Sequence, residues 1–258
     1  MTDSTNTDRK LALITGGSRG LGRNTILHLA DRGVDCIFTY LSNRAEAEKV
    51  VSEVAAKGAR AFALQLDTAD TSSFPAFVEA LKTTLKQEFS RETLDFLVNN
   101  AGVGIYKSIA DTNEAEFDKL VNIHLKGVFF LTQRLLPMIP DGGRILNVSS
   151  GLARFTLPGH AAYACMKGAI EVFTRYLAKE LGPRHISVNV IAPGAIETDF
   201  GNGMVRDNVE ANQAVAATTA MGRAGLPDDI GGAVADLLCG EFGWMTGQRI
   251  EVSGGQNI

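Results

Sequence analysis

Tyr163 and Lys167 stand four residues apart in a stretch with helical periodicity, residues 161–181. Side chains at this spacing share one face of a helix, so the phenol and the ammonium could act on the same atom. A phenol normally titrates at about pH 10, but a nearby cation lowers that pKa, and an oxidised nicotinamide ring would add a second cation. Such a phenol could protonate a carbonyl oxygen as hydride arrives. Y-x-x-x-K also occurs on helices without any catalytic role, so the pair needs support.

Ser150 provides part of that support. It follows an apolar run, residues 144–148, that predicts a strand ending in Ser149-Ser150-Gly151. Ligand sites of open α/β sheets form at the carboxyl ends of strands. A hydroxyl there could hydrogen-bond a substrate oxygen and stabilise developing charge. The alternative is that two serines simply terminate a strand.

A glycine-rich run, TGGSRGLG at residues 15–22, separates the first predicted strand from the first predicted helix. Glycines at such a turn let the backbone approach a pyrophosphate, whose charge is met by N–H groups of the helix N-terminus. The spacing is G-x-x-x-G-x-G rather than the commoner G-x-G-x-x-G. Glycine that only relieves strain in a βα loop is the alternative.

The residues after the second predicted strand favour NADPH over NADH. Tyr40 is followed by residues 41–44, which contain no Asp or Glu to bind a ribose 2′-hydroxyl. Asp35 lies at the opposite end of that strand, too far away for this role. Arg19 and Arg44 could each bind a 2′-phosphate through charge-assisted hydrogen bonds. For either arginine, the alternative is a solvated surface charge without a binding role. For Arg44 the two interpretations carry equal weight.

From Lys10 onward, short apolar runs alternate with amphipathic stretches, as in repeated βα units. The expected fold is one α/β domain over residues 10–258, a doubly wound Rossmann fold with a seven-stranded parallel sheet flanked by helices, after a flexible N-terminal tail at residues 1–9. Strands are expected at residues 11–15, 35–40, 61–66, 94–99, 144–149, 187–192 and 249–252, and helices at 20–32, 44–57, 71–89, 114–138, 161–181 and 228–238. Residues 197–221 are expected to form a mobile substrate lid; a loose surface insertion is the alternative.

Composition excludes several classes of protein. A net charge of −4 without a basic stripe argues against a nucleic-acid partner. The first ten residues lack an apolar run and no later stretch reaches membrane-spanning length, so we expect a cytoplasmic protein with no membrane partner. Cys36, Cys165 and Cys239 are far apart and are interpreted as buried small apolar residues, and no metal site is expected.

In order along the chain, these motifs resemble those of the short-chain dehydrogenase/reductase family. The resemblance covers essentially everything from Lys10 to the C-terminus, and is greatest to 3-oxoacyl-acyl-carrier-protein reductases and to sugar-alcohol and carbonyl reductases. The matching motifs are the family's T-G-x-x-x-G-x-G at residues 15–22, its N-N-A-G at 99–102, its catalytic serine at Ser150, its Y-x-x-x-K at Tyr163 and Lys167, and its P-G turn at Pro193-Gly194.

The resemblance implies an NADPH-dependent oxidoreductase that reduces a ketone or aldehyde to an alcohol, reversibly, with Tyr163 as general acid. The implied catalytic residues are Asn122, Ser150, Tyr163 and Lys167, Asn122 holding a water in a proton relay to the lysine. The expected cofactor contacts are Gly16, Ser18, Arg19, Gly20, Leu21, Gly22, Ser42, Asn43, Arg44, Asp67, Asn100, Ala101, Gly102, Tyr163, Lys167, Pro193, Gly194, Ile196 and Thr198.

Several alternatives stay open. A catalytically silent NADPH-binding protein that acts as a redox-sensing regulator is the rival function, and alcohol oxidation is the rival direction. Arg154 and Arg206 are candidates to recognise an acyl carrier, whereas Phe155, Leu157 and Met204 indicate an apolar substrate pocket. The partner is expected to be a small-molecule carbonyl or alcohol. Assembly as a homotetramer, or a homodimer, is implied by the resemblance of residues 114–138 and 161–181 to the family's interface helices.

Overall fold

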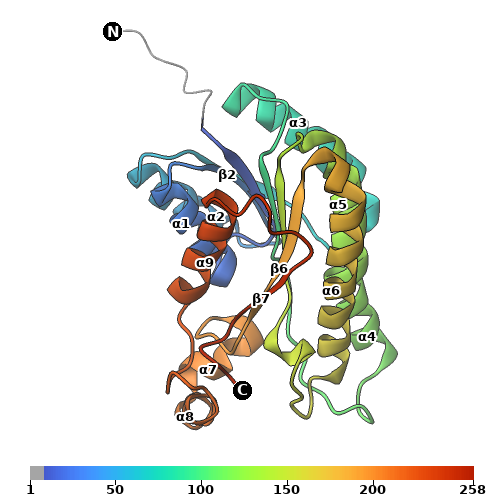
Figure 1. The fold of residues 1–258 in the computed structure, drawn as a ribbon, viewed down its shortest axis with the longest axis vertical. Helices are drawn as coiled ribbons and strands as arrows, with labels where there is room; N and C mark the ends of the chain where they lie inside the picture. Colours follow the sequence, from blue (N-terminus) through green and yellow to red (C-terminus); the bar gives the residue numbers. More distant parts are fainter. Residues whose placement is uncertain (1–8) are drawn as a thin grey trace.

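The computed structural model describes residues 9–258, which form one parallel seven-stranded sheet between two layers of helices (Figure 1). The strand order is β3-β2-β1-β4-β5-β6-β7, and every neighbouring pair is parallel. The strands are β1 (Leu11–Ile14), β2 (Asp35–Tyr40), β3 (Ala61–Gln65), β4 (Phe96–Asn99), β5 (Arg144–Val148), β6 (Ser187–Pro193) and β7 (Arg249–Val252). The predicted fold class is confirmed. The tail predicted for residues 1–9 lies outside the described residues except Arg9, whose guanidinium donates to the Gly58 carbonyl.

Each face of the sheet carries its own apolar core. The helices α1 (Gly20–Asp31), α2 (Arg44–Ala56) and α9 (Pro227–Cys239) cover one face, and α3 (Phe74–Phe89), α5 (Gly127–Leu135) and α6 (Ala161–Leu181) cover the other (Figure 1). The chain builds β1 to β3 in one direction and resumes at β4 on the other side of β1. The carboxyl ends of β1 and β4 therefore flank the switch point where ligands bind in such sheets.

The helix predicted over residues 114–138 is interrupted. It divides into α4 (Glu114–Val121), a π-helical turn η2 (Asn122–Lys126), α5 and a short 3₁₀ turn η3 (Leu136–Met138). In the π turn the Gly127 N–H donates to the Asn122 carbonyl. Gly127 also lies so close to Thr68 that a Cβ there would come 2.0 Å from the Thr68 carbonyl oxygen. Single π turns inside helices are frequent at functional sites.

Residues 197–221 contain helices that the sequence pattern did not predict. These are η6 (Phe200–Gly203), α7 (Met204–Asp207) and α8 (Val209–Ala217). The Asn208 side chain caps α8 by accepting from the Ala211 N–H at 2.9 Å. The C-terminal segment holds the end of α8, since Asn257 N–H donates to the Thr218 carbonyl at 2.8 Å. Closure of this segment as a lid stays a prediction.

Two further observations concern the surface. Cys36 is buried as expected, but Cys165 and Cys239 are exposed, so the interpretation of all three as buried was wrong; Cys165 lies within α6 and Cys239 is the last residue of α9, and these helices have one side in solvent. Within residues 9–258, no helix combines the length and the apolar character that crossing a membrane requires.

Candidate active site

Ser150, Tyr163 and Lys167 converge beyond the carboxyl end of β5. Ser150 has extended backbone angles after the strand, and its Oγ accepts from the Leu152 N–H at 3.2 Å. Tyr163 and Lys167 lie on one face of the first turns of α6, only 7% and 5% exposed. The Ser150 hydroxyl lies close enough to the Tyr163 phenol to lower its pKa, and Lys167 Nζ lies 5.4 Å from the phenol ring centre. The geometry predicted from their spacing is therefore present.

Lys167 is held in place by the strand beside it. Its Nζ donates to the Val148 carbonyl at 2.7 Å, and burial lowers its pKa to about 7. Burial also raises the pKa of the Tyr163 phenol, and the neighbouring Ser150 hydroxyl acts in the opposite direction. The sequence led us to expect a lowered phenol pKa; in the chain alone, desolvation is the larger effect. Tyr163 consequently keeps its proton at neutral pH and can donate it.

The glycine loop leaves the start of α1 open to an anion. Arg19, the residue before the helix, is extended and makes no side-chain cap, so the first N–H groups of α1 have no partner from that side chain. Gly16 has a φ of +68°, and a Cβ on Gly22 would lie 2.2 Å from the Gly16 carbonyl oxygen. The loop can therefore close this tightly only with glycine at both positions, and its residues fit a pyrophosphate.

Residues that follow β4 form hydrogen bonds with the glycine loop and hold its backbone in place. The Asn100 side-chain amide donates to the Thr15 carbonyl at 2.8 Å and to the Gly16 carbonyl at 3.1 Å. Thr15 Oγ1 accepts from the backbone N–H groups of Asn100 and Ala101, both at 3.0 Å. Asn100 thus shapes the glycine loop through its side chain.

The two candidate 2′-phosphate ligands differ in their surroundings. Arg19 is exposed and makes no ion pair with any described residue. Arg44 Nε donates to Glu48 Oε1 at 2.7 Å, so a phosphate would have to compete with that carboxylate. Asp35 lies at the other end of β2, where it forms an ion pair with Arg60 at 2.6 Å. This position agrees with the prediction that Asp35 does not bind the cofactor.

The remaining predicted cofactor contacts lie along the same edge of the sheet. Asp67 follows β3, accepts from the Ala69 N–H at 2.8 Å, and with Leu41 lines a cavity of about 510 Å³ beside α3. Thr198, beyond β6, is buried opposite the glycine loop, where a Cβ on Gly20 would lie 3.8 Å from Thr198 Cβ. The edge thus gathers the candidates from five strand ends: Gly16, Ser18, Arg19, Gly20, Leu21 and Gly22 after β1; Ser42, Asn43 and Arg44 after β2; Asp67 after β3; Asn100, Ala101 and Gly102 after β4; Pro193, Gly194, Ile196 and Thr198 at β6. Their contacts with a cofactor stay predictions.

A protein-family model described as Enoyl-(Acyl carrier protein) reductase matches residues 16–257. The chain belongs to the short-chain dehydrogenase/reductase family. The hydroxynaphthalene reductase-like protein Arp2 of Metarhizium brunneum is 35% identical over 257 residues, covering 95% of this chain and 94% of the relative. Versicolorin reductase of Emericella nidulans is 34% identical, covering 98% and 97%. The angucycline C-6 ketoreductase LanV, solved with bound NADP, superposes with a TM-score of 0.91 at 34% identity, covering 96% of this chain and 95% of that one.

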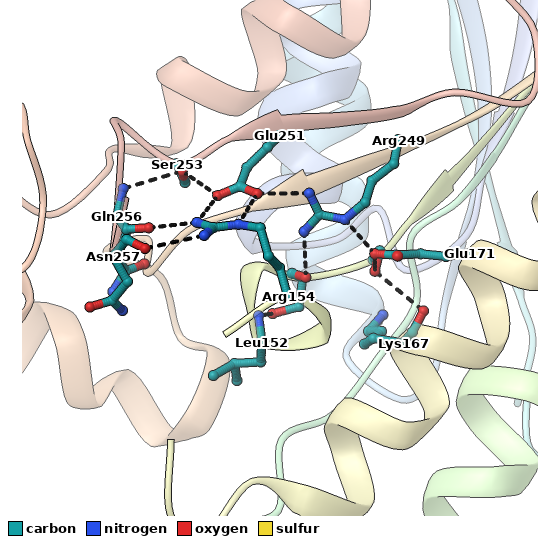
Figure 2. A network of polar contacts seen from close by, with 11 residues as sticks. Leu152, Arg154, Lys167, Glu171, Arg249, Glu251, Ser253, Gln256 and Asn257 are labelled. Atoms are coloured by element: carbon teal, nitrogen blue, oxygen red, sulfur yellow. Dashed lines mark hydrogen bonds and ion pairs between the residues drawn. The ribbon is translucent and has the colours of Figure 1, made fainter. Parts of the chain in front are cut away.

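This short-chain dehydrogenase/reductase also has a polar network behind Ser150 that the sequence did not reveal (Figure 2). Arg249 donates to Glu171 and Glu251 at 2.7 Å each and, at 3.4 Å, to the Ser150 carbonyl. Glu171 accepts from the Ser149 hydroxyl at 2.7 Å. The last strand is thereby tied to the end of β5 and to α6, the two elements that carry the catalytic side chains.

Both arginines considered for acyl-carrier recognition are engaged within the chain. Arg154 donates to both oxygens of Glu251 at 2.7 Å and to the Gln256 and Asn257 carbonyls (Figure 2). Arg206 is paired with Asp199 and Asp207. Carboxylates of the chain therefore already neutralise both guanidiniums.

On the π turn, His124 lies next to Tyr163. The His124 ring meets the Tyr163 ring edge to face at 5.2 Å between centroids. Asn122 is half-buried, and its side chain makes no hydrogen bond with any described residue. No sequence signal singled out His124, since Asn122 and Lys126 are also polar residues of the same stretch. The relay role of Asn122 stays a prediction.

Aromatic side chains surround the outer side of the phenol. Phe200, from the segment after β6, has its ring centroid 5.7 Å from that of Tyr163. Phe200 also lies over Gly104, where a Cβ would come 2.9 Å from its ring. The rings of Tyr106 and His160 meet at 5.3 Å, and Tyr106 is 72% exposed. Phe200 therefore presents a flat apolar surface beside the catalytic tyrosine.

Proposed function

We propose that this chain is an NADPH-dependent reductase that converts a ketone or aldehyde to an alcohol, reversibly, at Ser150, Tyr163 and Lys167. The observation that carries the proposal is the meeting of these three side chains at the sheet edge that also holds the open glycine loop. Solved structures of similar proteins in complex with NADP or NADPH support the choice of cofactor. Arg19, exposed beside the loop, is the proposed 2′-phosphate ligand.

NADPH, when bound, supplies the hydride. Ser150 donates a hydrogen bond to the substrate oxygen and so orients the carbonyl. Tyr163 gives its proton to that oxygen, a transfer that the raised pKa of the phenol leaves available at neutral pH. Lys167, fixed by the Val148 carbonyl, presents positive charge next to the phenolate that remains. In alcohol oxidation the same groups work in reverse.

For the substrate we propose a planar aromatic ketone. Relatives named as hydroxynaphthalene, tetrahydroxynaphthalene and versicolorin reductases act, by their names, on fused aromatic compounds. The ring of Phe200 beside Tyr163 suits a flat apolar substrate. The engagement of Arg154 and Arg206 argues against an acyl-carrier substrate.

The test is NADPH oxidation by the purified protein with a panel of aromatic and aliphatic ketones and aldehydes, repeated with Tyr163→Phe. We expect NADPH binding to persist and kcat to fall by about a hundredfold or more in the variant, because the general acid is lost. Equal turnover by the variant would refute the mechanism. NADPH binding without turnover of any carbonyl would instead favour the redox-sensing regulator, and comparable turnover with NADH would refute the cofactor preference.

We also propose that the protein assembles as a homodimer or homotetramer through α5 and α6. The support is a group of exposed aromatic side chains on their outer face, of which Phe129 and Phe130 lie 5.2 Å apart. A cytoplasmic location stays a prediction from the sequence.

A further inference from the structure

Arg154 is a charged side chain that the proposed mechanism does not use, although it stands only four residues after Ser150. It follows a single 3₁₀ turn, in which the Arg154 N–H donates to the Gly151 carbonyl at 2.8 Å. The Ala153 N–H donates to the Ser150 carbonyl at 3.1 Å. Residues 150–154, which form this serine turn, are thus one hydrogen-bonded unit, and a contact that holds Arg154 also holds Ser150.

The Arg154 guanidinium binds residues 253–257, the segment that follows β7 (Figure 2). Its Nη2 donates to the Gln256 carbonyl at 2.7 Å, and its Nη1 donates to the Asn257 carbonyl at 3.1 Å. Nε and Nη2 also donate to the two carboxylate oxygens of Glu251, at 2.7 Å each, and this bidentate contact orients the planar group. One side chain therefore fixes the serine turn relative to residues 253–257.

The same segment holds the turn after β6, residues 193–196. The buried Gln256 side chain accepts through Oε1 from the Ala195 N–H at 3.0 Å. The backbones are packed closely, because a Cβ on Gly194 would lie 2.9 Å from Ser253 Cα. Gln256 thus contacts Arg154 through its carbonyl and the turn after β6 through its side chain, and it links the two.

The serine turn and the turn after β6 are also neighbours in space. The Ser149 N–H donates to the Ile191 carbonyl at 2.7 Å, and a Cβ on Gly151 would lie 3.5 Å from the Pro193 carbonyl oxygen. In the proposed reaction Ser150 orients the ketone, and the turn after β6 is predicted to contact the cofactor. A change of about 1 Å in their separation would therefore disturb the geometry of hydride transfer.

We propose that Arg154 is a positioning residue: by binding Glu251 and the Gln256 carbonyl, it holds the serine turn against the turn after β6 and so fixes Ser150 relative to the bound cofactor. Arg154 acts through Ser150 rather than on the substrate, since its guanidinium already binds a carboxylate and two carbonyls. The inference rests on the proposed carbonyl reduction for its kinetic consequences, but the contact between the two turns can be measured without turnover.

A double-mutant cycle between Arg154 and Ser150 separates this role from a general effect on stability. Arg154→Met keeps an unbranched apolar side chain and removes every donor. We expect it to lower kcat for a ketone about tenfold or more in the wild-type background, but less than about twofold in Ser150→Ala, because displacing the hydroxyl has no effect once the hydroxyl is absent. Arg154→Lys, a milder change that keeps the charge without the planar fork, should lower kcat about threefold or more, again only where Ser150 is present.

Arg184→Met is the matched control. The side chains of Arg184 and Arg154 are both 36% exposed, and Arg184 likewise donates to one carboxylate, Asp141 at 2.9 Å, and to two backbone carbonyls, those of Leu136 and Ile139. It precedes β6 and so lies at the opposite end of the sheet from the catalytic edge. We expect its kcat to stay within about twofold of wild type. Wild-type kcat in Arg154→Met, or an equal loss in both backgrounds of the cycle, would overturn the proposal.

Hydrogen exchange followed by mass spectrometry tests the contact without turnover. In Arg154→Met we expect the amides of residues 194–195 and 253–257 to exchange about threefold faster or more, because their N–H groups are bonded across or within this contact, whereas the control variant should leave both segments unchanged. Wild-type exchange rates in Arg154→Met would overturn the proposal. Faster exchange together with equal turnover by wild type and Tyr163→Phe would instead refute the proposed function and leave the contact established.

Discussion

Arg19 and Arg44 are both arginines at the same edge of the sheet, but their contacts predict different contributions to binding of the 2′-phosphate. Arg44 is already neutralised by Glu48 at 2.7 Å, whereas Arg19 has no acidic partner among the described residues. A guanidinium without an intramolecular partner can bind a phosphate without first breaking an ion pair. The side chain that discriminates NADPH from NADH is therefore expected to be Arg19.

Arg19→Ala should raise the Kd for NADPH about tenfold and leave the Kd for NADH almost unchanged, because only NADPH carries the 2′-phosphate. Arg44→Ala should have a smaller effect, about threefold or less. Fluorescence titration with both cofactors measures these values. A larger NADPH effect from Arg44→Ala than from Arg19→Ala would reverse the assignment, and equal losses for both cofactors would mean that neither arginine binds the phosphate.

At the scale of elements, β7 positions the catalytic strand end through Arg249 and Glu251. Arg154, Arg249 and Ser253 hydrogen-bond the Glu251 carboxylate and lower its pKa to about 2. A carboxyl whose pKa is lower in the folded chain than in the unfolded one stabilises the fold above its ordinary pKa. That contribution is lost as pH falls from about 4.5 towards 2.

Glu251→Gln should lower the free energy of unfolding at pH 7 by about 1–2 kcal/mol, a value reduced for partial exposure of the group. The difference from wild type should shrink by roughly half at pH 3, because the wild-type carboxylate is then losing its advantage. Urea unfolding at both pH values measures this. The control is Glu92→Gln, since Glu92 is exposed and unpaired among the described residues. An equal difference at pH 7 and pH 3 would contradict the argument.

The sequence predicted most elements because most obey one periodicity. Buried strands such as β2 and β6 are short and rich in apolar residues, and their parallel pairing follows from the intervening helices. The π turn at Asn122–Lys126 escaped prediction because apolar residues continue through it at near-helical spacing. The helix α8 escaped because it buries no residue and so shows no apolar face.

The site was predictable where chemistry is local and not where it depends on tertiary contacts. Tyr163 and Lys167 are positioned by one helix, so their spacing was sufficient. His124 reaches Tyr163 only because the π turn reorients the chain between α4 and α5. Arg249 reaches Ser150 across a sequence separation of 99 residues, which no local pattern reveals.

At the scale of the whole molecule, the outer face of α5 and α6 carries a group of exposed apolar side chains. Phe129, Phe130, Val172 and Tyr176 are 41%, 40%, 45% and 68% exposed, and Phe129 packs on Phe173 at 5.0 Å. The two helices lie side by side on one face of the sheet (Figure 1). A contiguous aromatic surface of this kind is favoured at interfaces between subunits.

We therefore expect light scattering after size exclusion to give two or four times the mass of one chain, and Tyr176→Glu to shift it towards a single chain. The substitution places a charge that a subunit interface would bury without a partner, which destabilises the interface. It should change the stability of the isolated chain little, because Tyr176 is exposed there. Ile109→Glu, at a residue 81% exposed on a different surface, should leave the mass unchanged. A Tyr176→Glu protein with the wild-type oligomeric mass would show that subunits meet elsewhere, and a monomeric wild type would refute the assembly altogether.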